Sequence, residues 1–392
     1  MREAVIVSAV RTAIGKQGGT LASVPPHVFG AEVIIEALKR VKISPTLVED
    51  VILGNVLSGG GNIARLTALQ TGLSIELPGL TIDRQCGSGI NAVMLAAQAI
   101  QAGDGDVYVA GGIESMSRAP YLMDRPEKPY STVPPRIRKS QLSPVEIGDP
   151  PMGITAENLA KKYKISREEQ DVFAANSQQK MKKAIDDGRF IEQIVPINIP
   201  VRKGNPVVFK QDEHPRPDST NEVLAKLPPA FLEAGTVTAG NSSGLNDAAA
   251  ALIVMSREKA EELGIKPLAV IKAHAVAGVD PAIMGIGPVP ATRKVMEKSG
   301  LSLEDMDIIE INEAFAAQVI ACDRELNMNL EKVNVNGGAI AHGHPLGATG
   351  AILLTKAIYE LARINGRYAL ITACIGGGQG ISVIIERETD AF

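Results

Sequence analysis

The chain has 392 residues, of which 45% are hydrophobic and 21% charged, and its formal net charge is −4. This is ordinary globular composition, with enough length for two or three packed units. Negative net charge, 3% aromatic residues and the lack of Trp argue against a protein that holds nucleic acid or an anionic membrane through a basic, ring-bearing surface.

The three cysteines are Cys86, Cys322 and Cys374. They are too few and too scattered for a disulfide framework, and they lack the Cys/His spacing of a zinc site. No stretch reaches the ~18 apolar residues that a membrane span needs. The apolar run at the N-terminus is too short for a signal peptide and predicts a buried strand. We therefore expect a cytoplasmic protein with reduced thiols and no metal site.

Short Val- and Ile-rich runs alternate with longer helical stretches, which predicts an α/β protein with largely buried strands. The predicted strands are 4–9, 50–55, 79–85, 106–110, 268–273, 307–311, 332–335, 368–374 and 381–386. The predicted helices are 28–39, 89–101, 154–164, 167–187, 291–298, 313–325 and 347–362.

The order of strand, reactive turn, helix and Gly-ended strand occurs twice, around residues 81–112 and again around 333–378. This repetition predicts a duplicated half. Residues 118–240 break the alternation and open with a Pro-rich, basic stretch, as expected of a substrate-covering insertion. We therefore expect an N-terminal half (1–117 plus 245–266), an inserted loop domain (118–244) and a C-terminal half (267–392).

Cys86 lies in the sequence Asp-Arg-Gln-Cys-Gly-Ser-Gly, between an apolar strand and an Ala-rich helix. A helix N-terminus presents unpaired N–H groups and partial positive charge, so it stabilises a thiolate and lowers the thiol pKa. Cys86 is therefore a candidate nucleophile, although most unpaired cysteines are small buried core residues. Cys322 lies inside a helix without a reactive signature and is assigned to the core.

The second half carries a Gly- and His-rich turn, residues 336–350, in the equivalent place. A histidine there can take a thiol proton or stabilise an oxyanion. Both His342 and His344 are available, and a purely structural turn is the alternative. We choose His344, which is followed by Pro345, over His342.

Cys374 ends an apolar strand and precedes Ile-Gly-Gly-Gly-Gln-Gly, a run that can aim N–H donors at a bound group or simply form a flexible turn. Asn312 falls between a strand and a helix. It is a candidate site residue, and capping of that helix is an equally good interpretation.

These segments together resemble the thiolase family over essentially the whole chain. The matching segments are 5–12, 83–89, 109–117, 235–247, 285–290, 312–315, 343–347 and 374–378. The resemblance implies a thiolase-like fold, in which two related α/β halves pack through central helices and a loop domain is inserted between them. It also implies an acyl-CoA C-acyltransferase that makes or cleaves 3-ketoacyl-CoA, as in fatty-acid β-oxidation.

The resemblance assigns a role to each matching residue. Cys86 is the acylated nucleophile, His344 activates it, and Cys374 exchanges a proton with the substrate α-carbon or the CoA thiol. Asn312, through a water, and His344 form one oxyanion hole, while the N–H groups of Cys86 and Gly376 form the other. The chemistry agrees, because one cysteine cannot be acylated and serve as that base at once.

Coenzyme A is expected as substrate and product, without a metal or redox cofactor. The resemblance places Ser243 at the pantetheine and Arg216 near the adenine. It also implies an apolar lining, whose members would otherwise be ordinary core residues: Met152, Phe231, Leu245, Met284 and Phe315.

Members specialised for acetoacetyl-CoA often carry His before the Met-Gly of the insertion, whereas here Pro151 precedes Met152-Gly153. This feature resembles the broader 3-ketoacyl-CoA thiolases. Two alternatives remain, a ketoacyl synthase and a thiolase-like acyl-CoA or lipid-binding protein without turnover. Cys374 argues against the synthase, and the retained Cys86 and His344 argue against the binding protein. The family implies a homodimer or homotetramer.

Overall fold

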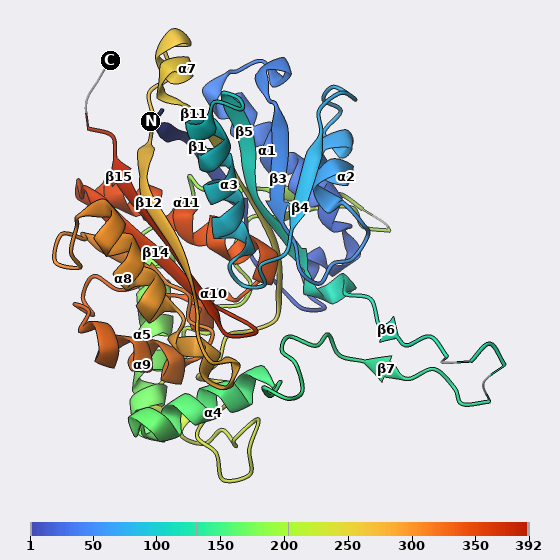
Figure 1. Ribbon diagram of the computed structural model, residues 1–392, viewed down its shortest axis with the longest axis vertical. Coiled ribbons are helices and arrows are strands. Elements are labelled where there is room, and N and C mark those ends of the chain that lie inside the picture. Colours follow the sequence, from blue (N-terminus) through green and yellow to red (C-terminus); the bar gives the residue numbers. More distant parts are fainter. Residues whose placement is uncertain (1, 127, 131, 203, 390–392) are drawn as a thin grey trace.

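The computed structural model describes residues 2–126, 128–130, 132–202 and 204–389. Residues 1 and 390–392, which end the two predicted halves, lie outside these ranges. Figure 1 shows a layered body from which one long hairpin projects. The described residues form an 11-stranded sheet whose main path runs β13-β14-β15-β12-β1-β11-β5-β3-β4.

The N-terminal half of the sheet is β1 (Ala4–Thr12), β11 (Asn246–Ser256), β5 (Val107–Ser115), β3 (Asp50–Gly54) and β4 (Gly79–Ile82). The C-terminal half is β12 (Ala269–Gly278), β15 (Gln379–Arg387), β14 (Tyr368–Ile375) and β13 (Ile308–Ile311). In both halves the first two strand pairs are antiparallel and the third is parallel, counted outward from β1 in one half and from β12 in the other. The repeated pairing pattern confirms the predicted duplication.

The two halves meet where β1 pairs antiparallel with β12, at Val5↔Val270 and Ile6↔Ala269. Their helices also correspond in order. They are α1 (Pro26–Val41), α2 (Ile63–Gln70) and α3 (Ser88–Ala102) in the first half, and α8 (Pro288–Ser299), α9 (Ala316–Leu326) and α11 (Leu346–Ile364) in the second. The short helices α7 (Arg257–Glu262) and α10 (Ala339–His342) lie outside this correspondence.

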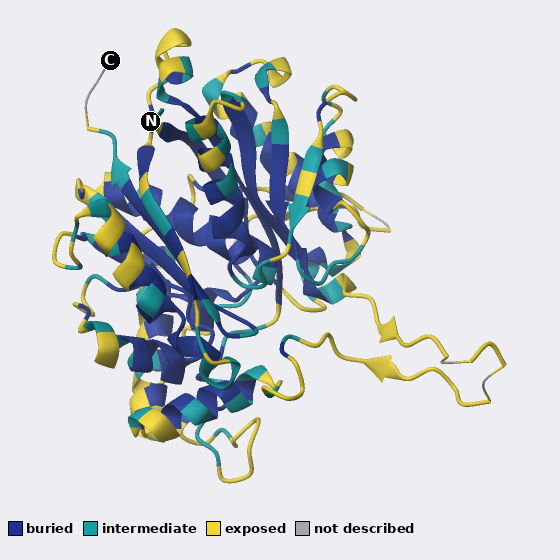
Figure 2. Ribbon diagram, in the orientation of Figure 1, coloured by how far each residue is buried: buried dark blue, intermediate teal, exposed yellow. Residues whose placement is uncertain are grey.

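Side-chain alternation along the buried strands separates the core into layers. On β5, Val107 and Val109 face a cluster that includes residues of α1 and α2, whereas Tyr108 and Ala110 face the cluster around α3 and α11. A third cluster lies between the C-terminal strands and helices α8 and α9. Figure 2 shows the buried sheet between partly exposed helices.

Helices α3 and α11 cross at the centre of the molecule, and glycines allow the crossing. A Cβ on Gly350 would lie 2.3 Å from the backbone nitrogen of Ile90, and a Cβ on Gly89 would lie 2.7 Å from that of Ala351. Any side chain at either position would push the helices apart. The close crossing places the turns before both helices in the same region of the molecule.

The insertion contains β6 (Leu122–Met123), β7 (Ile137–Arg138), α4 (Met152–Tyr163), α5 (Arg167–Asp186), β8 (Ile194–Val195), β9 (Ile197–Ile199), β10 (Val207–Phe209) and α6 (Asn221–Leu224). β6 and β7 form the projecting hairpin of Figure 1, and Figure 2 shows both strands exposed. The remaining short elements are β2 (Gly15–Lys16) and the 3₁₀ turns Thr20–Ser23, Pro45–Leu47, Met116–Arg118 and Pro281–Ile286.

Two sequence predictions need correction. Residues 332–335 form no strand, because only Val333 makes a bridge, parallel to Ile309. β11 and α2 were not predicted at all. β11 is buried at every position, so its sequence shows no alternation of polar and apolar residues.

Candidate active site

Cys86 lies in the tight turn that joins β4 to α3. The turn is held by the Ser88 hydroxyl, which accepts from the N–H of Arg84 at 2.8 Å and donates to the carbonyl of Gln85 at 2.7 Å. Gln85 adopts a left-handed φ of 46°, and Gly87 packs so closely against Ile375 that a Cβ would lie 2.6 Å from its Cδ1. The sequence therefore fixes the position of Cys86, a residue that is half-buried as a whole although its sulfur is removed from water.

Burial raises the pKa of the Cys86 thiol to about 11, while backbone N–H groups of Gly376 and of Cys86 itself act in the opposite direction. The sequence predicted a lowered pKa, and for the protein without substrate that prediction is wrong. Loss of hydration destabilises the thiolate more than the N–H groups at the start of the helix stabilise it. The thiol is therefore protonated at neutral pH and needs a base to react as a thiolate.

His344 lies in the equivalent turn, before α11, and only 5% of its surface is exposed. Burial lowers the pKa of its imidazole to about 4, so the ring is neutral at neutral pH. Nδ1 lies 2.7 Å from the Thr349 hydroxyl. The N–H of His344 donates to Asn246 Oδ1 at 2.9 Å, and Asn246 Nδ2 donates to the carbonyl of Gly15. A buried neutral imidazole in a fixed position can act as a general base.

Asn312 is fully buried in the loop between β13 and α9, and its Nδ2 lies 3.3 Å from His344 Nε2. Its Oδ1 has no partner among the described residues. The helix-capping alternative for Asn312 is wrong, because α9 begins at Ala316 with Phe315 as its N-cap. The amide is thus available for polar contact beside the histidine.

Cys374 lies near the end of β14 and is fully buried. Burial, and then the charge of the neighbouring Cys86, raise the pKa of this thiol well above its ordinary value. Ala314 and Phe315, from the loop that carries Asn312, pack against it. The turn that follows contains Gly376, whose N–H approaches the Cys86 sulfur. The structure therefore brings Cys86, Cys374 and Gly376 together. It also pairs Asn312 with His344, and the loop of Asn312 packs against Cys374.

His342 takes part in a different environment. Its Nδ1 lies 2.8 Å from the carbonyl of Gly343, and its buried Nε2 has no partner among the described residues. Burial, followed by the charges of Lys356 and Arg11, lowers its pKa well below the ordinary value. Of the two histidines, only His344 has a described contact with Asn312.

A groove of about 880 Å³ lies beside the site, lined by insertion residues and by both halves. Four predicted CoA contacts line it: Arg216, Phe231, Ser243 and Leu245. The other three, Met152, Met284 and Phe315, pack around Cys374 instead. The rings of Phe231 and Phe315 meet edge to face, 6.0 Å apart, and connect the two groups. The predicted contacts therefore form one chain of neighbouring side chains between the groove and Cys374.

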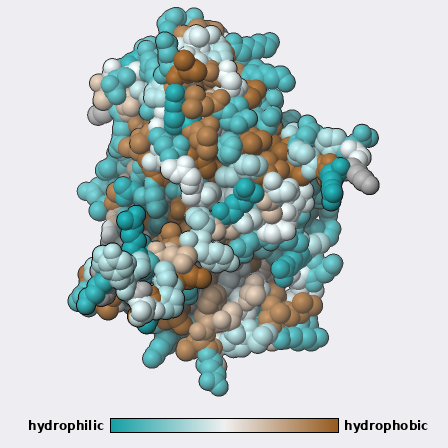
Figure 3. Space-filling view, turned by 90° about the vertical axis from the view of Figure 1, so that its right-hand side faces the viewer, coloured by the Kyte–Doolittle hydropathy of each residue, from teal (hydrophilic) through white to brown (hydrophobic). Residues whose placement is uncertain are grey.

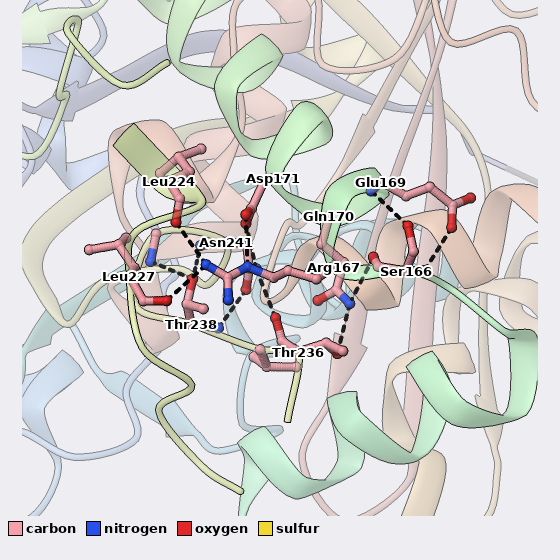
Figure 4. A network of polar contacts seen from close by, with 12 residues as sticks. Ser166, Arg167, Glu169, Gln170, Asp171, Leu224, Leu227, Thr236, Thr238 and Asn241 are labelled. Atoms are coloured by element: carbon pink, nitrogen blue, oxygen red, sulfur yellow. Dashed lines mark hydrogen bonds and ion pairs between the residues drawn. The ribbon is translucent and has the colours of Figure 1, made fainter. Parts of the chain in front are cut away.

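One wall of the groove is held by a polar network centred on Arg167 and Asp171 of α5 (Figure 4). Arg167 pairs with Asp171 at 2.7 Å and donates to the carbonyls of Leu224 and Leu227, two groove residues. Asp171 accepts from Asn241 Nδ2 at 2.9 Å, just before Ser243. The network fixes the segment that carries the predicted pantetheine contact.

Sequence reasoning missed several residues that support the site. Thr349 and Asn246 hold His344, while Lys16 and His214 line the groove. Asn246 falls inside the segment 235–247 that carried the family resemblance, so a signal for it existed. Lys16 and His214 carry no local signal, because only the tertiary structure brings them to the groove.

Residues 4–258 match the N-terminal domain of thiolases, and residues 265–387 match the C-terminal domain. The chain belongs to the thiolase family. Both the predicted family and the predicted fold are thereby confirmed, as is the class of enzyme, an acyl-CoA C-acyltransferase.

Individual relatives cover nearly the whole chain. An acetyl-CoA acetyltransferase of Pseudomonas aeruginosa is 50% identical over 99% of this chain and 100% of its own. The crystal structure of the Bacillus anthracis acetyl-CoA acetyltransferase matches with a TM-score of 0.93 and 47% identity, covering 99% of each chain. Human mitochondrial 3-ketoacyl-CoA thiolase in complex with CoA matches with a TM-score of 0.92 and 44% identity, covering 99% of this thiolase and 98% of the human chain.

Among the described residues, no group of three or more His, Cys, Asp and Glu side chains could hold a metal ion. None of the helices in the described part of this thiolase has the length and apolar character needed to cross a membrane.

Proposed function

We propose that this thiolase interconverts a 3-ketoacyl-CoA and free CoA with two acyl-CoA molecules through an acyl-Cys86 intermediate. The observation that carries the proposal is that two thiols, Cys86 and Cys374, are neighbours, since Gly87 packs directly against Ile375. Cys374 also packs with Phe315, whose ring contacts Phe231 of the groove. An N–H donor from Gly376 approaches the first thiol, and the His344–Asn312 pair lies on the adjoining loops.

In the cleavage direction, His344 Nε2 takes the proton of Cys86, and the thiolate attacks the 3-keto carbon. The N–H groups of Cys86 and Gly376 stabilise the tetrahedral oxyanion. The bond between C2 and C3 then breaks, its electron pair forms the enolate of acetyl-CoA, and Cys374 donates its proton to C2. Asn312 and His344 stabilise the enolate oxygen, and the acyl group remains on Cys86.

In the second half-reaction, the Cys374 thiolate takes the proton of incoming CoA. The CoA thiolate attacks the acyl-Cys86 carbonyl, and Cys86 leaves as a thiolate that recovers its proton from His344. Thiolates suit both steps, because they are strong nucleophiles and good leaving groups. The reverse sequence is the Claisen condensation, and neither direction needs a metal or redox cofactor.

For CoA we propose that the groove holds the pantetheine along Ser243, Phe231 and Leu245. The side chains of Phe231 and Leu245 are 44% and 53% exposed, which favours an apolar ligand on top of them. Lys16 and Arg216 supply positive charge to the same groove, complementary to the CoA phosphates. Because the mechanism needs reduced thiols, we propose that the protein is located in the cytoplasm.

The decisive experiment measures CoA-dependent cleavage of 3-ketoacyl-CoA thioesters from acetoacetyl-CoA to long chains. Wild-type cleavage that Cys86→Ala abolishes is the expected result. Because Pro151 precedes Met152, we expect activity beyond acetoacetyl-CoA, and cleavage of acetoacetyl-CoA alone would contradict that part. If no chain length is cleaved, the thiolase activity is rejected. The remaining alternatives are then the acyl-CoA or lipid-binding protein and the ketoacyl synthase, which needs an acyl carrier partner.

We also propose that a second copy of the chain pairs with the free edge of β4. This strand ends the sheet, and exposed apolar side chains gather on the face that carries it: Leu66, Leu69, Ile75 and Leu80 (Figure 3). An unpaired edge with an apolar surround is suited to a two-fold symmetric dimer. The projecting hairpin, with exposed Tyr121 and Ile137, offers a further contact for a tetramer.

Light scattering after size-exclusion chromatography tests the dimer. Leu80→Lys is expected to give a monomer, because a charge on the edge strand blocks pairing. Ile364→Lys, at a 41% exposed position at the end of α11, is the matched control and should leave the mass unchanged. A dimer that survives Leu80→Lys would overturn the placement at β4.

A further inference from the structure

Neutral imidazole has two tautomers, and only one of them leaves Nε2 of His344 able to take a proton. We propose that Thr349 is a positioning residue that fixes His344 in the Nδ1–H tautomer, so that the Nε2 lone pair faces Asn312 and the reacting thiol. The inference rests on the proposed function, since that function makes Nε2 the atom that receives the proton of Cys86.

The first support is the geometry of the Thr349 hydroxyl. This side chain is fully buried in the first turn of α11, and its Oγ1 lies 2.7 Å from His344 Nδ1. The hydroxyl proton is already directed elsewhere, because Oγ1 donates to the carbonyl of Pro345 at 2.9 Å. Oγ1 therefore accepts from Nδ1–H, which places the imidazole proton on Nδ1.

The second support is that the opposite side of the ring cannot decide the tautomer. Asn312 Nδ2 lies 3.3 Å from Nε2, whereas Asn312 Oδ1 is buried and has no partner in the described part of the chain. An amide turned by a half rotation would offer that oxygen to an Nε2–H. Asn312 can thus satisfy either tautomer, and the contact at Nδ1 determines which one is populated.

The backbone fixes the remaining freedom of the histidine. Asn246 Oδ1 accepts the His344 N–H at 2.9 Å, so the turn holds the residue in place. Gly343, with φ of 101°, packs against Asn246 so closely that a Cβ would lie 2.4 Å from its side chain. Asn246 therefore positions the main chain of His344, and Thr349 acts on the ring alone.

The same helix offers a matched control. Thr355 is also fully buried, and its hydroxyl donates to the carbonyl of Ala351 at 2.8 Å, four residues earlier, as Thr349 does to Pro345. No described hydrogen bond joins Thr355 to a histidine. A valine at 355 or at 349 keeps the branched shape and removes one intrahelical hydroxyl bond, but only the change at 349 removes the acceptor of the imidazole proton.

The kinetic experiment compares Thr349→Val, Thr349→Ser and Thr355→Val in the full-length protein. For Thr349→Val we expect kcat/KM for 3-ketoacyl-CoA cleavage to fall by about 10- to 100-fold, a part of the 10²–10⁴-fold that a positioned base contributes. The KM for CoA should stay unchanged, because Thr349 does not line the groove. Thr349→Ser should recover most of the activity, and Thr355→Val should match wild type.

Nitrogen-15 NMR of histidine-labelled protein reads the tautomer directly, with the His344 signals identified by their loss in His344→Asn. In wild type we expect a protonated Nδ1 and an unprotonated Nε2, and in Thr349→Val a mixture of tautomers. A wild-type Nε2–H, or a Thr349→Val variant with unchanged tautomer and activity, would overturn the inference. Should wild type cleave no 3-ketoacyl-CoA, the proposed function fails, while the NMR spectrum still decides the role of Thr349.

Discussion

The two halves of this thiolase share one strand order, yet equivalent places in them carry different groups. The turn before α3 carries Cys86, and the turn before α11 carries His344. Glu114 lies near the end of β5 as Cys374 lies near the end of β14, whereas the place after β3 and β13 carries an asparagine in both halves, Asn55 and Asn312. The duplicated topology therefore supplies the places, and the residue in each place determines the chemistry.

In the N-terminal half, two of these places serve structure. Glu114 is fully buried and accepts from the N–H groups of Leu57 and Ser58 and from that of Gly347 at the start of α11, each at 2.9–3.0 Å. Asn55 donates to the carbonyl of Ile113. This half thus holds the nucleophile on a rigid turn. In the proposed mechanism the C-terminal half contributes the buried groups that transfer protons, and this division can be tested.

The largest loss of activity is expected from removal of the Cys86 thiol, the proposed nucleophile of the N-terminal half. Cys86→Ala should lower the rate of 3-ketoacyl-CoA cleavage by about 10⁴-fold or more, since loss of a nucleophile removes the covalent route. Spectrophotometric turnover measures it. Cys322→Ala is the control, because this buried thiol on α9 donates to the Gly285 carbonyl, accepts from Gln318 and should leave kcat near wild type. Substantial turnover by Cys86→Ala would contradict the assignment.

Cys374→Ala tests the proton-transferring group of the C-terminal half. We expect a loss of about 10²–10⁴-fold in condensation and in α-proton exchange, the range for a general acid–base group. Acylation of Cys86 by acetyl-CoA, followed by mass spectrometry of the intact protein, should be much less affected, because CoA is a good leaving group as a thiolate. Equal losses in both reactions would show that the two halves do not divide the chemistry in this way.

The buried His344 should make the free energy of unfolding depend on pH. The pKa of His344 falls from 6.5 in the unfolded chain to about 4 on folding, so the unfolded state binds the extra proton between these values. The free energy of unfolding should therefore drop as pH falls from 6.5 to 4, by about 1.4 kcal/mol per pH unit from this residue. Urea titrations of wild type and His344→Asn measure the difference, and parallel pH profiles would refute it.

The smallest effect concerns the predicted insertion. Arg167→Met removes the donors to the Leu224 and Leu227 carbonyls (Figure 4), so the groove wall loosens. We expect the KM for CoA to rise by about 3- to 10-fold with little change in kcat, consistent with loss of one charged hydrogen-bonding group. Arg293→Met, at an exposed ion pair with Glu325, is the control. A change in kcat alone would place Arg167 in the chemistry.

Several features of the site followed from sequence because they are local. Cys86 before a helix, His344 before another and Cys374 before a glycine run each stand at a recognisable junction of strand, turn and helix. The strand at Val333 was overpredicted, since a short apolar run does not reveal whether it has a full partner. β11 was missed because a strand buried on both faces shows no alternation of polar and apolar residues.

The sequence by itself determined the family and the two-half fold, and it supplied the candidates for the chemistry, because these depend on short motifs in a fixed order. Only the tertiary structure decided the protonation of the site. Burial raises the pKa of Cys86 against the effect of its helix, and Thr349 contacts His344 through the first turn of α11. Desolvation and hydrogen-bond partners depend on everything that packs around a group, and neighbours in sequence supply only part of that surrounding.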